Sequence, residues 1–187
     1  MNLLTGSIMK AETRKIRAVI FLLSLFLLVS RVSISASPLE YEVKAAFLLK
    51  FVEYVEWPDS LQNDDLSSYT VGIVGKDPFG TLLPEKIVSS ETPSKTFNII
   101  RVNNSEEACN CQILFFSNGE SQRILDKVKK MPVLTVGEGD IFLYDGGVIS
   151  FIMEDNRVRF LVSMKNANQA GLKINSRLLR LARKVLN

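Results

Sequence analysis

Short apolar segments that alternate with helix-length segments are the feature that most constrains how this chain can fold. Four of these segments are predicted to be strands, at residues 69–75, 96–102, 111–116 and 133–136, and the first of them is predicted to be buried. Helices are predicted between strands, at residues 79–88 and 120–130. Because a helix that joins two short strands implies parallel pairing, we expect an α/β fold whose mostly parallel sheet carries helices on both faces.

The pattern changes near the carboxyl end. Residues 146–153 and 158–163 have strand character, and the segment between them contains Asp155 and Asn156, which tolerate the left-handed geometry of a tight turn. This predicts a β-hairpin. A final helix is predicted over residues 176–186, with Ser176 as its N-cap.

An apolar stripe predicts the first helix, over residues 39–56. Its side chains recur at four-residue steps, at Val43, Phe47, Phe51 and Val55. The helix is expected to end at Trp57-Pro58, because a residue that precedes proline is pushed out of helical geometry.

The first 36 residues have the pattern of a secretory signal peptide. A basic stretch precedes an apolar run at residues 18–29, and small residues follow at Ser33, Ser35 and Ala36. The run has about 12 residues, whereas a helix that spans a bilayer needs about 20. We therefore expect residues 1–36 to be removed, leaving residues 37–187 as a single periplasmic domain without a membrane anchor.

Removal of this segment changes the charge of the chain. The whole sequence has 23 Lys and Arg, 20 Asp and Glu, and a formal net charge of +3. Residues 1–36 contain five of the basic residues and one acidic residue, so the remaining domain has a net charge of −1. The basic charge of the whole sequence therefore does not indicate nucleic-acid binding.

Candidate catalytic groups are few. The chain has no histidine, which excludes Ser-His-Asp and Cys-His pairs, histidine-ligated zinc and the usual general base at neutral pH. Two carboxylate pairs, Glu138 with Asp140 and Glu154 with Asp155, lie in turn-like segments where solvated acids are expected. We therefore predict no catalytic residue, no cofactor and no metal site.

The segment GKDPFG, residues 75–80, follows the first predicted strand. A glycine-rich loop at this position can present backbone N–H groups to a phosphate. The glycine spacing is neither that of a dinucleotide fingerprint nor that of a P-loop, so a tight turn with Pro78 is the favoured interpretation.

Cys109 and Cys111 are the only cysteines. Two cysteines in an oxidising compartment suggest a disulfide, yet alternate residues of a strand lie near the largest Cα separation that a disulfide allows. Three interpretations stay open: a strained, reducible Cys109–Cys111 bond, two free thiols with Cys111 buried at a strand start, or a link between molecules. Two cysteines alone do not make a metal site.

The first predicted helix is rich in aromatic residues, at Phe47, Phe51, Tyr54 and Trp57. Core packing is the simpler interpretation of this group. Aromatic residues are also enriched at protein interfaces, so those of the four that reach the surface are predicted to bind a partner.

The last predicted helix is basic, with Arg177, Arg180, Arg183 and Lys184 on its polar face. A solvated face that the helix dipole favours explains these residues without a partner. The alternative is a docking site for an acidic surface, for which we select Arg177 and Arg180.

The order of these motifs resembles the YfiR-like family of secreted bacterial proteins. The resemblance covers residues 39–185 and is carried by EYEVKAAFLLKFVEYVEWP, VGIVGKDPFG, CQILFF, PVLTVGEGD, the Gly-Gly before the hairpin and AGLKINSRLLRLA. It implies an α/β fold and, for some members, a homodimer. In relatives where the cysteine that matches Cys111 forms a long-range disulfide, the partner lies elsewhere in the chain. Here only Cys109 is available, which puts redox control by such a bond in doubt.

The resemblance also implies a periplasmic regulator that is not an enzyme. Its relatives bind the periplasmic sensing domain of an inner-membrane diguanylate cyclase and hold that enzyme inactive, which restrains cyclic-di-GMP production and biofilm formation. A periplasmic small-ligand sensor is the alternative. Ligands of alternating β/α sheets bind at the carboxyl ends of the strands, which here are GKDPFG and VGEGD, residues 136–140.

Overall fold

The computed structural model describes residues 38–58, 68–89, 95–117 and 122–187. All of these fall within one unit, Ser37–Asn187. The expected signal peptide, residues 1–36, lies outside the described residues and stays a prediction.

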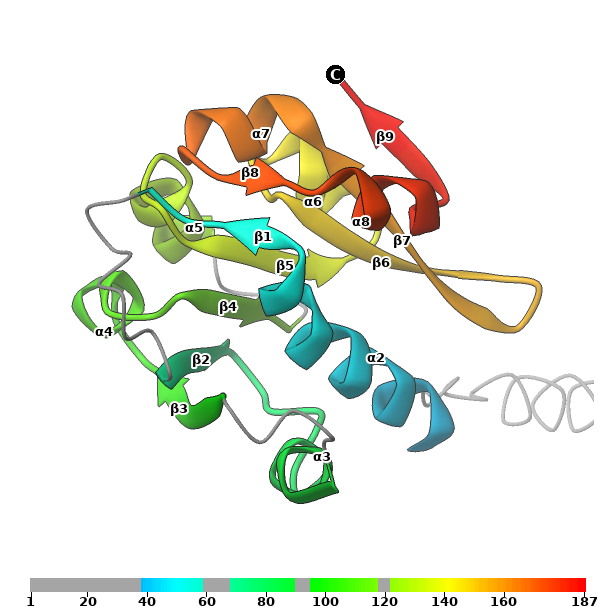
Figure 1. The fold of residues 1–187 in the computed structure, drawn as a ribbon. Helices are drawn as coiled ribbons and strands as arrows, with labels where there is room; N and C mark the ends of the chain where they lie inside the picture. The colour runs from blue at the N-terminus through cyan, green and yellow to red at the C-terminus, as the bar shows by residue number, and fades with distance from the viewer. Residues whose placement is uncertain (1–37, 59–67, 90–94, 118–121) are drawn as a thin grey trace, which may run out of the picture. The chain divides into compact units, whose positions relative to one another are not determined.

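A seven-stranded sheet forms the centre of the fold (Figure 1). In spatial order its strands are β3 (Thr96–Val102), β2 (Ser68–Val74), β4 (Ile113–Phe116), β5 (Leu134–Glu138), β6 (Ile149–Glu154), β7 (Arg157–Ser163) and β9 (Lys184–Leu186). Only β6 and β7 pair antiparallel, and the other neighbouring pairs are parallel. The predicted α/β fold with a mostly parallel sheet is confirmed.

Helices cover both faces of the sheet. Helices α2 (Pro38–Lys50), α3 (Leu82–Ser89), α7 (Met164–Gln169) and α8 (Ser176–Leu181) contribute to the larger of two cores. Helices α4 (Ser105–Cys109) and α5 (Gln122–Val128) contribute to the smaller core, which the short helix α6 (Ile141–Tyr144) borders through Phe142. Successive side chains of a strand point to opposite faces, so in β4 Phe115 belongs to the larger core and Phe116 to the smaller one.

An aromatic cluster fixes the end of α2 against the carboxyl-terminal strands. Phe51 is fully buried, and its ring centroid lies 5.9 Å from that of Phe151 on β6 and 5.5 Å from that of Phe160 on β7. These separations are typical of favourable aromatic pairs. Phe47 lies 5.6 Å from Phe160 and extends the cluster toward the surface.

The predicted hairpin is confirmed. Its turn is formed by Asp155 and Asn156, whose φ angles of 50° and 58° are the left-handed values that a two-residue hairpin turn requires.

The first helix is shorter than predicted. It ends at Lys50, and the chain continues through a 3-10 helix, Phe51–Glu53, into a two-residue strand, β1 (Val55–Glu56). Strand β1 pairs with β8 (Lys173–Ile174) in a separate two-stranded sheet. The four-residue stripe continues because Phe51 and Val55 still face the larger core, but pairing with β8 replaces the helical hydrogen bonds.

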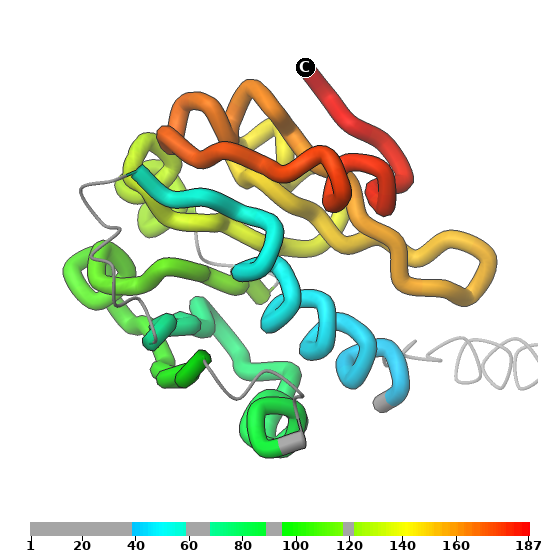
Figure 2. The backbone as a smooth tube through the Cα atoms, in the orientation of Figure 1, coloured from blue at the N-terminus to red at the C-terminus, as the bar shows by residue number. Residues whose placement is uncertain are grey.

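The last helix is also shorter than predicted. It ends at Leu181, and residues 184–186 form strand β9, which pairs with β7 along one edge of the sheet (Figure 2). Strand β9 covers an edge of β7 that would otherwise expose unpaired backbone groups, and the backbone N–H of Arg183 donates to Phe160 at 2.8 Å. The N-cap is Asn175 rather than Ser176, since the Asn175 side chain accepts a hydrogen bond from Arg177 N.

The aromatic cluster predicts a large and specific loss of stability. We expect Phe51→Ala to lower the free energy of unfolding by about 3–5 kcal/mol, because it leaves a cavity among three rings. Val88→Ala on α3 is the control, since Val88 is 88% exposed and should change stability by less than about 0.5 kcal/mol. Urea unfolding monitors both variants, and equal losses would contradict this account of the core.

Candidate functional site

Two of the four predicted aromatic partner residues lie in the core. Phe51 is fully buried and Trp57 is 5% exposed. Neither can present its ring to a partner in this structure. Phe47 and Tyr54 are half-buried, so the prediction of an aromatic docking face rests on these two.

The four basic residues assigned to one helix face separate in the structure. Arg177 and Arg180 lie on α8 and are exposed, whereas Arg183 and Lys184 lie beyond its end. The Arg183 Nε–H group donates to both carboxylate oxygens of Glu154 on the hairpin, with nitrogen–oxygen distances of 2.8 and 2.7 Å. This pair raises the pKa of Arg183. The prediction of one continuous basic helix face is therefore wrong.

Tyr54 and the start of α8 are joined directly. The backbone N–H of Asn175 donates to the carbonyl of Tyr54 at 2.8 Å, and β1 and β8 pair beside this contact. We call Arg177, Arg180 and Leu181 the α8 surface, and the Tyr54 backbone lies beside the start of this helix. Leu181 is 59% exposed although it is apolar, and in the described part of the chain no ion pair involves either arginine.

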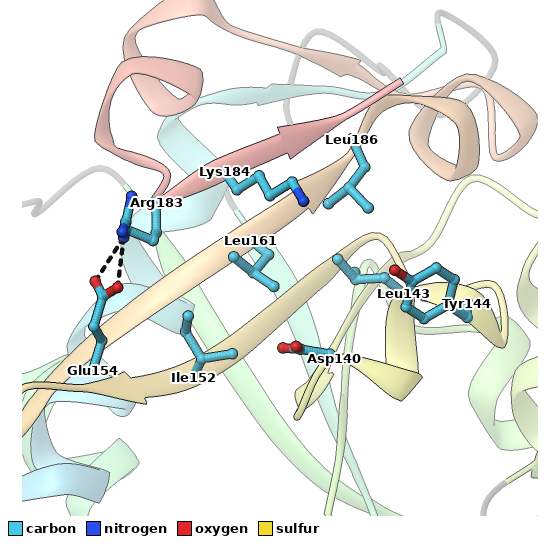
Figure 3. Close-up of a pocket in the computed structure, with 9 residues that line it drawn as sticks. All are labelled: Asp140, Leu143, Tyr144, Ile152, Glu154, Leu161, Arg183, Lys184 and Leu186. Atoms are coloured by element: carbon cyan, nitrogen blue, oxygen red, sulfur yellow. Dashed lines mark hydrogen bonds and ion pairs between the residues drawn. The ribbon is translucent and has the colours of Figure 1, made fainter.

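A recess of about 300 Å³ lies on the part of the sheet that faces away from α2 (Figure 3). Its apolar lining comes from β6, β7 and β9, through Ile152, Leu161 and Leu186, and from Leu143 on α6. The Arg183–Glu154 ion pair borders one end. Strand β9 builds one wall of this recess, so the recess was not foreseen while residues 176–186 were expected to be helical.

A second recess, of about 430 Å³, lies at the carboxyl ends of β4 and β5. Its lining includes Phe116 and Glu138 from these strands and Asp140 from the loop after β5. This is one of the two places where a ligand was expected. At the other, GKDPFG, the Asp77 carboxylate accepts hydrogen bonds from the N–H groups of Phe79 and Gly80 within its own turn. That arrangement agrees with the tight turn favoured from the sequence.

A buried ionic cluster links α2 to the end of β5. The Lys44 side chain is 5% exposed and donates to Glu138 at 2.5 Å and to Glu40 one helical turn away. Its ammonium group also lies 4.5 Å from the centre of the Tyr41 ring. Burial, and then the nearby charge of Glu138, raise the pKa of Tyr41 to about 12. No sequence pattern indicated this cluster, because Glu138 lies far from α2 along the chain.

Two of the four carboxylates considered for catalysis, Glu138 and Glu154, are in ion pairs, whereas Asp140 lies at the start of α6 without a side-chain capping hydrogen bond. Glu138 belongs to the Lys44 cluster, and Glu154 pairs with Arg183. Asp155 forms the hairpin turn. Across the described residues, no group of three or more Cys, Asp and Glu side chains could hold a metal ion.

Both cysteines are free thiols in the structure. Cys109 is the last residue of α4 and is half-buried, whereas Cys111 is buried just before β4. The position of Cys111 is the one that the two-thiol interpretation gave it, and the redox state of the pair stays a prediction. Burial, and then the Cys109 and Glu107 charges, raise the pKa of the Cys111 thiol to about 11.

Comparison with protein-family models identifies the family to which the chain belongs. A model described as YfiR/HmsC-like matches residues 41–183. The chain belongs to the YfiR/HmsC-like family. This family consists of periplasmic, non-catalytic regulators of cyclic-di-GMP signalling. No helix in the described ranges is long and apolar enough to cross a membrane.

Other comparisons give weaker likenesses. No curated protein matches the chain. Among solved structures, an ABC domain in complex with L-Trp from Streptococcus pneumonia shares 12% identity over 76% of this chain, with a TM-score of 0.49. A conserved domain protein from Vibrio cholerae shares 9% identity over 78% of this chain, also with a TM-score of 0.49. The match spans 60% of each of those chains, and TM-scores under 0.5 carry no argument about function.

The buried cluster predicts that Lys44 is required for stability. We expect Lys44→Met to lower the free energy of unfolding by about 3–5 kcal/mol, because it leaves two carboxylates buried without their partner. Lys50→Met on the same helix is the matched control. Lys50 pairs with Glu53 at an exposed site, where such a pair contributes about 0–1 kcal/mol. Denaturant unfolding would contradict this account if the two variants were equally stable.

Proposed function

We propose that this protein is a non-enzymatic periplasmic regulator that binds the periplasmic sensing domain of an inner-membrane signalling protein and represses a diguanylate cyclase. The observation that carries this proposal is the match of residues 41–183 to the YfiR/HmsC-like family. The carboxylates of Glu138 and Glu154 are held in ion pairs, which is consistent with a protein that acts by binding.

The α8 surface is the docking face that we propose. Arg177 and Arg180 are exposed side by side on one short helix, and Leu181 adds exposed apolar area beside them. A central apolar contact with a charged rim is the usual composition of a protein interface. The partner that fits is a segment of the receptor with acidic residues around an apolar side chain.

The mechanism is stoichiometric. A receptor that exchanges between active and inactive forms moves from 1:99 to 99:1 when its ligand prefers one form by about 5.5 kcal/mol. An interface that buries about 1,600 Å² is the standard size for a specific complex. A homodimer, which the family resemblance implied, would present two α8 surfaces to a dimeric receptor.

Cellular cyclic-di-GMP tests this function. We expect its level to rise when the gene is deleted and to fall again when the wild-type chain is restored. The double variant Arg177→Glu/Arg180→Glu should fail to restore repression, because the charge of the docking face is reversed. Arg123→Glu/Lys127→Glu on α5 is the matched control, since these exposed residues belong to a helix of the smaller core.

Protein levels of all variants are compared by immunoblot. An unchanged cyclic-di-GMP level in the deletion strain would overturn the proposed function. Full repression by the α8 double variant would leave that function intact and would show that the docking face is elsewhere.

A small-ligand sensor is the second candidate, and the recess at the carboxyl ends of β4 and β5 is the observation that favours it. Its volume of about 430 Å³ lies within the range of small-molecule sites. A ligand that binds there should raise the melting temperature, and Asp140→Ala, at the rim, should reduce that shift. A metabolite panel that leaves the melting temperature unchanged would remove this candidate.

A further inference from the structure

Helix α6 carries exposed apolar side chains with an acidic residue at each end. Ile141 is 73% exposed and Tyr144 is 78% exposed. They are three positions apart on one helix, so their side chains are neighbours. Asp140 precedes the helix and Asp145 follows it, and both are exposed. We call these four residues the α6 patch. Exposed apolar side chains inside a polar rim are typical of an interaction surface.

The α6 patch stands between the two recesses. Asp140 lines both of them, and Tyr144 lines the recess of Figure 3. Ile141 and Asp145 line the recess at the carboxyl ends of β4 and β5. The helix is therefore a ridge with a hollow on each side. In the described part of the chain, neither Asp140 nor Asp145 belongs to an ion pair.

The α8 surface has the opposite charge and a similar arrangement. Arg177 and Arg180 are also three positions apart on one helix, and exposed Leu181 lies beside them. An arginine can bind a carboxylate through two parallel hydrogen bonds. The partner that fits the α8 surface is an apolar side chain with acidic residues around it. The α6 patch of this same chain has that composition.

The two surfaces of one molecule lie on opposite sides of the sheet. Leu178 of α8 belongs to the larger core, whereas Phe142 of α6 packs against the smaller core. The α8 surface therefore reaches an α6 patch only on a second copy of the chain. Residues 37–187 have a net charge of −1, so overall charge repulsion between two copies is small.

We propose that the protein self-associates head to tail, with the α8 surface of one copy bound to the α6 patch of the next. A contact between two different surfaces is heterologous, and each end of such an assembly keeps one unused surface. Further copies can bind at these ends, so the assembly grows as the protein concentration rises. A two-fold homodimer differs, because both of its copies use the same surface.

Self-association and receptor binding then compete for the α8 surface. This consequence rests on the proposed function, in which the α8 surface binds the receptor. A copy whose α8 surface is covered by a second copy cannot bind the receptor, so dissociation of the assembly releases active repressor. By mass action, a higher protein concentration favours the assembled form.

Sedimentation velocity of the protein expressed from the full sequence tests the contact. We expect the wild type to form species larger than a monomer as its concentration rises. This association should be stronger at low salt, because ions screen exposed charges. The α8 variant, Arg177→Glu/Arg180→Glu, and the α6 variant, Asp140→Lys/Asp145→Lys, should each weaken it at least about tenfold, since like charges then face each other.

A matched control separates the α6 patch from a general effect of charge. Glu85→Lys/Glu106→Lys makes the same change of net charge as the α6 variant, at exposed residues of α3 and α4. It should self-associate like the wild type. A control that weakens association as much as the α6 variant would overturn the inference, and so would a wild type that stays monomeric at every concentration.

A mixture of the two variants tests the head-to-tail arrangement. The α6 variant keeps an intact α8 surface, and the α8 variant keeps an intact α6 patch. The mixture should therefore form a complex with one copy of each variant, although each variant alone stays monomeric. Formation of this complex also shows that both variants are folded. A mixture that forms no complex would overturn the head-to-tail contact.

The cyclic-di-GMP assay separates this inference from the proposed function. The α6 variant should repress at least as well as the wild type, because its α8 surface is intact and is not covered by a second copy. Weaker repression by the α6 variant, at equal protein level, would contradict the competition. Sedimentation requires no receptor, so the self-association can fail while the proposed function holds, and the reverse is also true.

Discussion

Burial of the central strands on both faces is the constraint on which the rest of the structure depends. In β4 all four residues are buried, and alternate side chains enter the two cores. A strand of this kind cannot be stable unless helices cover both sides of the sheet. The chain supplies α2 and its neighbours on one side and α4 and α5 on the other. The Phe51 cluster and the Lys44 cluster then fix α2 at two points.

The carboxyl-terminal part of the sheet differs from the central strands in how its two faces are covered. Strands β6 and β7 pack on the α2 side through Phe151 and Phe160, while the opposite side contains the recess of Figure 3. Arg177, Arg180 and Leu181 are exposed on α8, just before the chain enters β9, and the Arg183–Glu154 ion pair joins the residue that precedes β9 to the hairpin. The proposed docking face therefore depends on a segment that changes from helix to strand within three residues.

The sequence correctly predicted the segments whose residue pattern is compatible with only one type of secondary structure. Apolar runs predicted the first four strands of the large sheet along the chain, and Asp155-Asn156 predicted the hairpin turn. The ends of the first and last helices were wrong, because an apolar side chain every four residues also fits a strand that faces the same core. Aromatic density did not separate buried Phe51 and Trp57 from half-buried Phe47 and Tyr54. Contacts such as that of Lys44 with Glu138, or of Cys109 with Met131, join residues that are distant in the sequence. Only the folded structure shows such contacts.

The central claim is that the protein binds a membrane signalling receptor, and a pull-down tests it most directly. The tagged protein is incubated with detergent-solubilised membranes of its own organism, and the bound proteins are identified by mass spectrometry. The account predicts that a membrane diguanylate cyclase with a periplasmic domain co-purifies with the wild type and is lost with Arg177→Glu/Arg180→Glu. Recovery of no signalling receptor, when cyclases are demonstrably present in the extract, would contradict it.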